Sequence, residues 1–508
     1  MIFLEYKKKI LSGISWNVLS FLISAPLAYF VRVYYSHELP KLDVGLYYAV
    51  WDLFCVFAIF KALGLEQAII KYIPKYIAKN EYNMVKSSIV ITGILQFLIS
   101  GVFSGILILL APLIAKYYIN NQGQFSNDIF TVINVLILMT VGLQLLQGCA
   151  DFFSNIISGF QKQNYASSTR VVKIASVLIF SFIFINFFNL KNAYAPALAY
   201  AITPIIMIII YSSITFKKIY PNFFKDEFIF SKKIVKDLFS YSIPVMIGSA
   251  GSIILGYLDG ICLTYFTGLN TVADYRNVAL PTVTILSYIS VSVASVLFPM
   301  SSELWEKGHK EILNSIFEKI SYYSFLLILP FSLLMAYLPE TIIGILFTPE
   351  YLSASEPMKI LSIGAIFLTL NTIGFSVLNG IGKPALSTKI LYIGAFFNLT
   401  FNLLLIPKFG VFGAAITTVI GYLIMWILQI IYLRKFLHYS LNFNKYVLVS
   451  IVGIFSLIPL FLMKNIVFSS LIMKLSSFTI TYFLMYLTGL FMFKLISINE
   501  LKNLLNVK

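Results

Sequence analysis

The sequence predicts an all-α, polytopic membrane protein with about fourteen transmembrane helices. Of its 508 residues, 59% are hydrophobic and only 11% are charged, whereas a soluble chain has about 25% charged residues. Apolar runs of roughly 18–25 residues, long enough to span a bilayer as helices, are separated by short loops. The runs lack the two-residue alternation of a membrane β-barrel. Because backbone groups in lipid must bond internally, we expect a helix bundle.

The expected spans follow one another along the whole chain. The N-terminal stretch MIFLEYKKKI precedes a long apolar run without a small-residue cleavage site, so we expect an uncleaved first helix and not a signal peptide. Short helices between the spans could be amphipathic and interfacial. The expected spans are 13–35, 44–64, 86–115, 128–153, 169–188, 193–215, 239–265, 273–299, 316–338, 355–380, 386–406, 411–433, 446–464 and 471–493.

The distribution of Lys and Arg predicts the orientation of these spans. If the N-terminus is cytoplasmic, 28 of the 37 Lys and Arg residues fall in cytoplasmic segments or at the adjoining helix ends. This bias predicts that both termini are cytoplasmic. One loop, 301–319, carries four Glu against three Lys. This excess of Glu weakens the predicted orientation only slightly, because the positive-inside rule counts Lys and Arg and not acidic residues. The net charge of +16 therefore reflects topology and attraction to anionic lipids. Since the cations are dispersed among loops, we expect no nucleic-acid binding.

No catalytic or metal-binding residue stands out in this sequence. The three cysteines lie within apolar runs and imply no disulfide framework. The three histidines are scattered and have no metal-ligand spacing. No phosphate-binding Gly-x-x-x-x-Gly-Lys-Ser/Thr loop is present, so we do not expect ATP hydrolysis by this chain.

Several motifs recur in the same order in two halves of the chain. Tyr47 in VGLYYA matches Tyr275 in VADYRNVA at an offset of 228, and AYAPALAYA from Ala193 matches GVFGAAITT from Gly410 at an offset of 217. Each half holds six spans, and an even number predicts a parallel repeat. We expect two six-helix lobes, a basic linker and an appended helix pair with the C-terminal tail, at 1–216, 217–238, 239–433 and 434–508 respectively.

The segment from Asn398 to Thr418, NLTFNLLLIPKFGVFGAAITT, is expected to be a helical hairpin at the end of the second lobe. Pro407 and Gly410 would form its turn, and the small residues after Gly410 would allow close helix packing. Asn398 and Asn402 share one helix face. They could form interhelical hydrogen bonds or contact a substrate.

The run NGIGKPALSTKILYIGAFFNLTFNLLLIPKFGVFGAAITT resembles the C-terminal polysaccharide-biosynthesis module of the flippase superfamily that contains the multidrug and toxin extruders. GYLDGICLTYFTGLNTVADYRNVAL and GILFTPEYLSASEPMKIL are similar to further parts of the same family, and the similarity covers nearly the whole chain. The resemblance implies two six-helix lobes around a V-shaped central cleft. It also implies transport of lipid-linked oligosaccharides, whose phosphates would be held by cations of the cavity.

Ionisable residues at membrane depth are candidates for function, because burying each one costs about 2.5–3.5 kcal/mol. Four of them lie toward the outer leaflet on the first two helices of a lobe, namely Arg32, Asp52, Asp259 and Arg276. They could form a salt-bridged gate or contact a phosphate or sugar. Arg suits phosphate because its planar fork binds two oxygens at once, although Arg276 could also be an interfacial anchor.

A second group of candidates lies toward the cytoplasm. Lys61 ends the second span and Asp151 ends the fourth, where Gln144 and Gln147 precede it. We expect Asp151 to pair with Arg170 or Lys173, with ion coupling as the alternative. The glutamines could line a polar cavity or bond to neighbours. Glu66, in a segment that also resembles the family, has no assigned role.

The sequence therefore predicts a flippase that moves a lipid-(pyro)phosphate sugar from the inner to the outer leaflet by alternating access. We expect no cofactor, although H⁺ or Na⁺ could couple transport. The expected partners are a polyprenyl- or dolichyl-phosphate-linked oligosaccharide and membrane lipids, with a functional link to glycosyltransferases and a polymerase. The composition favours a prokaryotic plasma membrane. The alternatives are a multidrug or cation antiporter of the same fold and a membrane-bound glycosyltransferase or polymerase.

Overall fold

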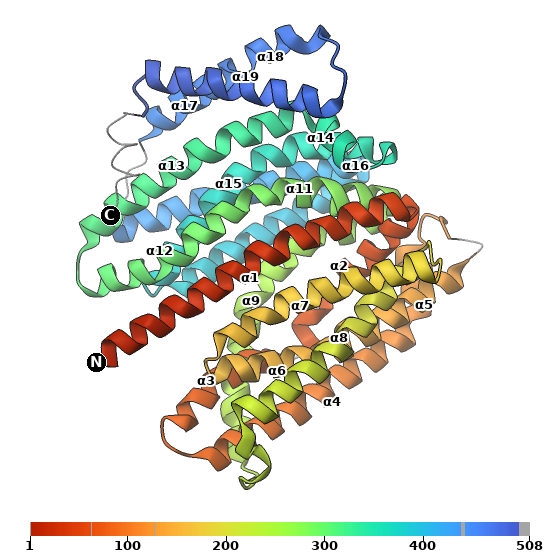
Figure 1. The fold of residues 1–508 in the computed structure, drawn as a ribbon, viewed down its shortest axis with the longest axis vertical. Coiled ribbons are helices and arrows are strands. Elements are labelled where there is room, and N and C mark those ends of the chain that lie inside the picture. Colours follow the sequence, from red (N-terminus) through yellow and green to blue (C-terminus); the bar gives the residue numbers. More distant parts are fainter. Residues whose placement is uncertain (1, 62, 126–127, 438–441, 497–508) are drawn as a thin grey trace. The chain divides into compact units, whose positions relative to one another are not determined.

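The described part of the protein is helical throughout (Figure 1). The computed structural model describes residues 2–61, 63–125, 128–437 and 442–496. In these ranges, thirteen stretches are long and apolar enough to cross a membrane. One of them, Pro384–Leu437, contains two helices joined at Gly410, so the described residues hold fourteen candidate spans. The predicted multi-pass, all-α fold is confirmed.

The chain divides into two compact units, Met1–Ala273 and Asp274–Lys508. Two basic segments counted for the topology, the side chains of residues 7–9 and the tail 497–508, lie outside the described part. The first unit contains α1 (Ile2–Glu38), α2 (Lys41–Lys61), α3 (Leu65–Ile77), α4 (Tyr82–Ile114), α5 (Ile129–Met139), α6 (Gln147–Gly159), α7 (Gln163–Phe182), α8 (Tyr194–Ile214), α9 (Lys232–Phe266) and α10 (Leu269–Val272). The second contains α11 (Leu280–Thr284), α12 (Tyr288–Glu306), α13 (Lys310–Tyr337), α14 (Pro339–Leu346), α15 (Ser355–Gly380), α16 (Pro384–Leu437), α17 (Phe443–Phe455), α18 (Ile458–Leu462) and α19 (Leu471–Met492).

Helix α9 belongs by packing to the first unit, although the repeat assigns it to the second lobe. It packs directly on α2 and α3. A Cβ at Gly64 would lie 2.3 Å from the carbonyl oxygen of Ser242, and one at Gly45 would lie 2.0 Å from that of Leu269. Only glycine permits such approaches. Packing thus assigns α9 to the first unit, whereas the repeat assigns it to the second lobe. The lobe boundaries that the repeat gives stay a prediction.

Matching contacts occur inside the two units at positions related by the repeat. In the first unit, the rings of Tyr47 and Tyr200 lie 5.8 Å apart between their centroids. In the second, the hydroxyl of Tyr275 lies 2.9 Å from the hydroxyl of Thr418. Tyr200 and Thr418 occupy the two segments that the sequence aligns. In each unit, the buried tyrosine therefore contacts the helix that the repeat makes equivalent, α8 in the first unit and the second arm of α16 in the second. An internal repeat predicts this correspondence.

The hairpin expected at 398–418 is confirmed. Within α16, Gly410 has a non-helical conformation with φ 55° and ψ −132°, which glycine adopts without a steric cost. After it the chain folds back on itself. A Cβ at Gly413 would lie 2.7 Å from the carbonyl oxygen of Leu405, and one at Gly394 would lie 2.6 Å from the side chain of Met425. Small residues thus let the two arms approach closely.

Helix α3 is one of the short amphipathic helices expected between spans. Its buried face consists of Leu65, Ala68, Ile69, Tyr72, Ile73 and Tyr76. The opposite face carries Lys71 and Lys75, and the Lys71 ammonium lies 3.8 Å from the ring centroid of Tyr241 on α9. Helix α3 packs on α6 and α9. Helix α3 begins beside the C-terminal end of α2, where the candidate site lies.

Candidate functional site

A buried ion pair joins two of the predicted site residues. The Nζ atom of Lys61, at the end of α2, lies 3.0 Å from Oδ2 of Asp151 on α6. The Lys61 side chain is 9% exposed and that of Asp151 is 34% exposed. The ammonium is therefore nearly removed from water, whereas one face of the carboxylate stays accessible. Such a pair is sensitive to loss of either partner, because the remaining charge would be buried alone.

Two glutamines hold this pair in position. Gln147 donates a hydrogen bond of 2.6 Å to Oδ1 of Asp151. Gln144 donates one of 2.8 Å to the carbonyl oxygen of Phe54 and so ties its own helix to α2. Of the two predicted roles for these glutamines, the structure shows bonding to neighbours. Gln144 lies in a π-helical segment, Thr140–Leu146, a local geometry that is frequent at functional sites.

The closest ionic partner of Asp151 is neither of the two that we expected, although Lys173 also interacts electrostatically with this carboxylate. We expected Arg170 or Lys173, but the contact is with Lys61, and the guanidinium of Arg170 instead lies 5.8 Å from the ring centroid of Phe21. The Lys61 side chain passes close to the small residue Gly148 on α6. A Cβ at this position would lie 3.6 Å from Cδ of Lys61. The lysine side chain can therefore lie along α6 and reach the carboxylate one turn further on.

Glu66 is a member of the site that the sequence left unassigned. Its Oε1 atom lies 3.9 Å from Nζ of Lys61. The side chain is 27% exposed, but Oε1 itself is buried and accepts no hydrogen bond from the described residues. Burial raises the pKa of this carboxyl, the Lys61 ammonium opposes the shift and the Asp151 carboxylate adds to it. The sequence signal that could have identified Glu66 is its position five residues after Lys61. The structure places this position in the first turn of α3.

The outer group of predicted residues is partly brought together in the first unit. Asp52 on α2 is fully buried, and Asp259 on α9 is 3% exposed. The contacts of Gly45 with Leu269 and of Gly64 with Ser242 show that α2 and α9 run antiparallel. Interpolation between these two contacts places Asp52 and Asp259 at the same level. Two buried carboxylates at one level require a nearby cation.

Of the two cations in this predicted group, Arg32 on α1 lies in the same unit as these carboxylates. Its Cζ atom lies 4.9 Å from the ring centroid of Tyr48, one helical turn before Asp52 on α2. The aromatic face stabilises the guanidinium. Arg276 lies in the second unit, in the π-helical segment Ala273–Ala279. It is 9% exposed, and its predicted roles stay predictions.

Asn398 and Asn402 form hydrogen bonds within the hairpin. Both are buried. Asn402 donates to Oδ1 of Asn398 at 3.0 Å, and its own Oδ1 accepts a hydrogen bond from the hydroxyl of Thr417 on the opposite arm. The first bond lies within one arm, and the bond from Thr417 is an interhelical bond as the packing interpretation expects. Substrate contact by either residue stays a prediction.

The described residues contain no group of three or more His, Cys, Asp or Glu side chains that could hold a metal ion. Within the same part of the chain, the three cysteines are free thiols. The chemistry available to the site is therefore ion pairing, hydrogen bonding and proton uptake by carboxylates.

Two family models match this chain. The model described as polysaccharide biosynthesis protein matches residues 10–305, and MatE matches residues 244–404. The chain is 56% identical over 503 residues to the uncharacterized membrane protein MJ1068 of Methanocaldococcus jannaschii, covering 99% of both chains. It is 23% identical to the probable low-salt glycan biosynthesis flippase Agl15 of Haloferax volcanii, covering 84% of this chain and 83% of the relative.

Among solved structures, the lipid II flippase MurJ in an inward closed conformation has a similar fold. The TM-score is 0.71 at 14% identity, covering 94% of this chain and 98% of the other. The family and the fold are those of transporters and flippases and not of enzymes. The chain thus belongs to the polysaccharide biosynthesis protein family, within the multidrug/oligosaccharidyl-lipid/polysaccharide exporter superfamily.

Proposed function

We propose that this protein is a flippase that moves a lipid-linked oligosaccharide from the cytoplasmic to the outer leaflet by alternating access. The names of two similar proteins support the substrate class, since one is a probable glycan biosynthesis flippase and the other a lipid II flippase. In this proposal the lipid tail stays in the bilayer while the sugar crosses. The cargo would be a polyprenyl- or dolichyl-phosphate-linked oligosaccharide made by glycosyltransferases and used by a polymerase.

The observation that carries the proposal is a set of charges on the helices of the first unit, of which Asp52, Asp259 and Lys61 are buried and Arg32 and Asp151 are partly exposed. Arg32, Asp52 and Asp259 share one region of α1, α2 and α9, and Lys61 pairs with Asp151 nearer the other end of α2. Holding these charges at membrane depth is costly, which favours a functional role. We propose that Arg32 and Lys61 exchange their carboxylate or aromatic contacts for the phosphate of the cargo.

This exchange would let the cargo shift the protein between its states. A ligand changes such an equilibrium only through different affinities for the two states. A cation that is paired with a carboxylate in one state and with the cargo phosphate in the other provides that difference. In the proposal both termini are cytoplasmic and the membrane is a prokaryotic plasma membrane. Net transport would be driven by H⁺ or Na⁺ or by consumption of the product outside.

The test is transport of a fluorescent polyprenyl-pyrophosphate oligosaccharide in proteoliposomes, measured as the fraction of label open to an external quencher. We expect Arg32→Ala and Asp259→Ala each to slow equilibration about tenfold or more, since one hydrogen bond to a charged group contributes about 1.5–3 kcal/mol. Lys307→Ala is the control, because this exposed lysine pairs only with Glu303 on its own helix. Normal transport by both variants, with intact folding, would refute the role of these residues.

A second candidate function is cation or drug antiport, which the MatE match over 244–404 and the two buried carboxylates favour. The same proteoliposomes separate the two functions. An antiporter would exchange an organic cation such as ethidium for H⁺ or Na⁺ and would leave the labelled oligosaccharide in its original leaflet. For the flippase we expect the opposite pattern.

A further inference from the structure

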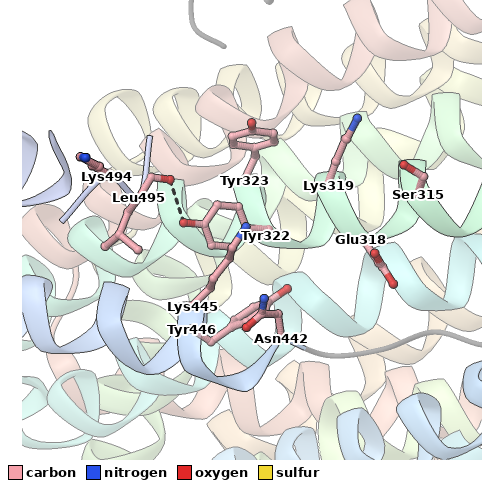
Figure 2. A pocket seen from close by; sticks show the side chains of 10 residues that line it. All are labelled: Ser315, Glu318, Lys319, Tyr322, Tyr323, Asn442, Lys445, Tyr446, Lys494 and Leu495. Atoms are coloured by element: carbon pink, nitrogen blue, oxygen red, sulfur yellow. Dashed lines mark hydrogen bonds between the residues drawn. The ribbon is translucent and has the colours of Figure 1, made fainter. Parts of the chain in front are cut away.

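A basic pocket lies in the second unit, outside the candidate site. It has a volume of about 350 Å³ and is formed by the first half of α13, the start of α17 and the segment that follows α19 (Figure 2). Three of its described lining residues are lysines, namely Lys319, Lys445 and Lys494, and one, Glu318, carries a carboxylate. The lining therefore has an excess of positive charge, which suits an anion.

The three lysines are available to an external anion. Within the described part of the chain, none of them forms an ion pair with a carboxylate. Glu318 accepts a hydrogen bond of 3.1 Å from Asn314 on its own helix, and in Figure 2 its side chain points away from that of Lys319. The Lys445 ammonium lies 5.7 Å from the ring centroid of Tyr322. The pocket thus combines three lysines with the aromatic side chains of Tyr322, Tyr323 and Tyr446.

The backbone after α19 is arranged to present one of these lysines. Lys494 has φ 52°, a left-handed conformation at a helix end where glycine is usually found. The turn lets Tyr322 donate a hydrogen bond of 3.0 Å to the carbonyl oxygen of Leu495 (Figure 2). A lysine is thus present where glycine would be less strained, which is consistent with use of its side chain.

An apolar groove of about 390 Å³ continues from this pocket. Tyr446 lines both. From there the groove follows one face of α17 through Val447, Ile451 and Ile454, with Phe325 and Trp426 on the neighbouring helices. Since a helix rises about 1.5 Å per residue, the path from Tyr446 to Ile454 is about 12 Å long. Such a length accommodates part of a hydrocarbon chain.

We propose that the pocket and the groove together bind one anionic membrane lipid, with the phosphate among Lys319, Lys445 and Lys494 and one hydrocarbon chain along α17. The expected cytoplasmic orientation of these helix ends supports the lipid as occupant, because that leaflet attracts clusters of basic residues. Lysine ammonium groups complement the phosphate charge. The occupant is a resident lipid of the second unit, so the proposal does not depend on the cargo.

The experiment counts lipids bound to the purified full chain by native mass spectrometry during titration with phosphatidylglycerol or phosphatidylcholine. We expect one tight phosphatidylglycerol, absent with phosphatidylcholine. The triple variant Lys319→Gln/Lys445→Gln/Lys494→Gln should lose this affinity by on the order of a hundredfold, from three lysines near the headgroup. The matched control is Lys435→Gln, because this exposed lysine also lies 5.7 Å from a tyrosine ring, that of Tyr432, but lines neither cavity.

Two further arms separate the sources of the phosphate. Inorganic phosphate and glycerophosphoglycerol, which have no hydrocarbon chain, should fail to displace the bound lipid at millimolar concentration. Displacement by either would overturn the lipid as the occupant. Equal phosphatidylglycerol binding by the wild type and the triple variant would overturn the pocket, as would an equal loss with Lys435→Gln. Thermal unfolding of each variant verifies that the compared proteins are folded.

Discussion

Two regions of this molecule bury polar side chains among apolar helices in different ways. In the α16 hairpin, Asn398, Asn402 and Thr417 are neutral and are joined by hydrogen bonds, and all three are buried. In the first unit, Lys61 and Asp151 are charged, and the Asp151 side chain keeps about a third of its surface exposed. The hairpin is closed around its polar groups, whereas part of the Asp151 side chain in the ion pair stays exposed.

This difference indicates what each arrangement is for. Neutral hydrogen bonds between packed helices stabilise a fold at little electrostatic cost, on average about 0.6 kcal/mol each in a membrane protein. A buried ion pair is weak support for stability, since apolar residues of similar volume often do as well. An accessible pair at membrane depth is better explained by a binding or switching role. The following predictions test that distinction, from the largest expected effect to the smallest.

The largest effect is expected from Asp151→Leu. Lys61 is 7% exposed, so the substitution would leave its ammonium buried beside Glu66 alone. Removal of one partner of a buried pair costs about 3–5 kcal/mol; since Asp151 is partly exposed, we expect about 3 kcal/mol. Thermal unfolding in detergent measures the loss.

The double variant Lys61→Met/Asp151→Leu sharpens this result. Because both charges are absent, we expect stability within about 1 kcal/mol of the wild type. Transport in proteoliposomes should nevertheless fall about tenfold or more. A stable double variant that transports normally would show that the pair is only structural, and the contrast with the hairpin would be lost.

A smaller loss of stability is expected from Gly413→Ala. The new Cβ would lie 2.7 Å from the carbonyl oxygen of Leu405, so the hairpin arms must separate at a cost of about 1–3 kcal/mol. Gly105→Ala is the matched control, because a Cβ there meets nothing within 4 Å. The melting temperature of Gly413→Ala should therefore be lower than that of Gly105→Ala. Equal stability would contradict the close packing of the hairpin.

Asn402→Ala should cost about 1 kcal/mol, because Asn398 and Thr417 would each lose a partner. If the hydrogen bonds serve packing alone, transport per folded molecule should not change. The comparison requires unfolding curves and transport rates on the same preparation. A large loss of transport with unchanged stability would instead favour the substrate-contact role of this asparagine.

The smallest effect is expected from Glu66→Gln and depends on pH. Burial raises the pKa of Glu66 in the folded protein, so the folded state binds the proton more tightly than the unfolded one. Stability supplied by this group is therefore present at low pH and is lost as pH rises from the ordinary Glu value of about 4.3 through the raised pKa. The melting temperature of the wild type relative to Glu66→Gln should fall over that window, and parallel pH curves would contradict it.

Most of the fold could be predicted from the sequence because its signals are local. Apolar length identified the spans and Gly410 identified the hairpin turn, whereas short amphipathic helices were expected between spans without being assigned to residues such as 65–77. The candidate site was predictable only by residue type. Charged residues are rare within apolar spans, so Lys61 and Asp151 could be selected as candidate site residues. Glu66 was passed over because it lies between spans and not within one.

The sequence by itself determined the class of molecule, the number of spans and the residues that must be costly to bury, since these depend on composition and helix length alone. The tertiary structure decided which charged residues form an ion pair. Asp151 pairs with Lys61, 90 positions away, because these parts of α2 and α6 lie next to each other only in the folded chain. Helix α9 joins the first unit because Gly45 and Gly64 allow backbone contact. These contacts require close approach between segments that are far apart in the sequence. No local sequence pattern specifies such an approach.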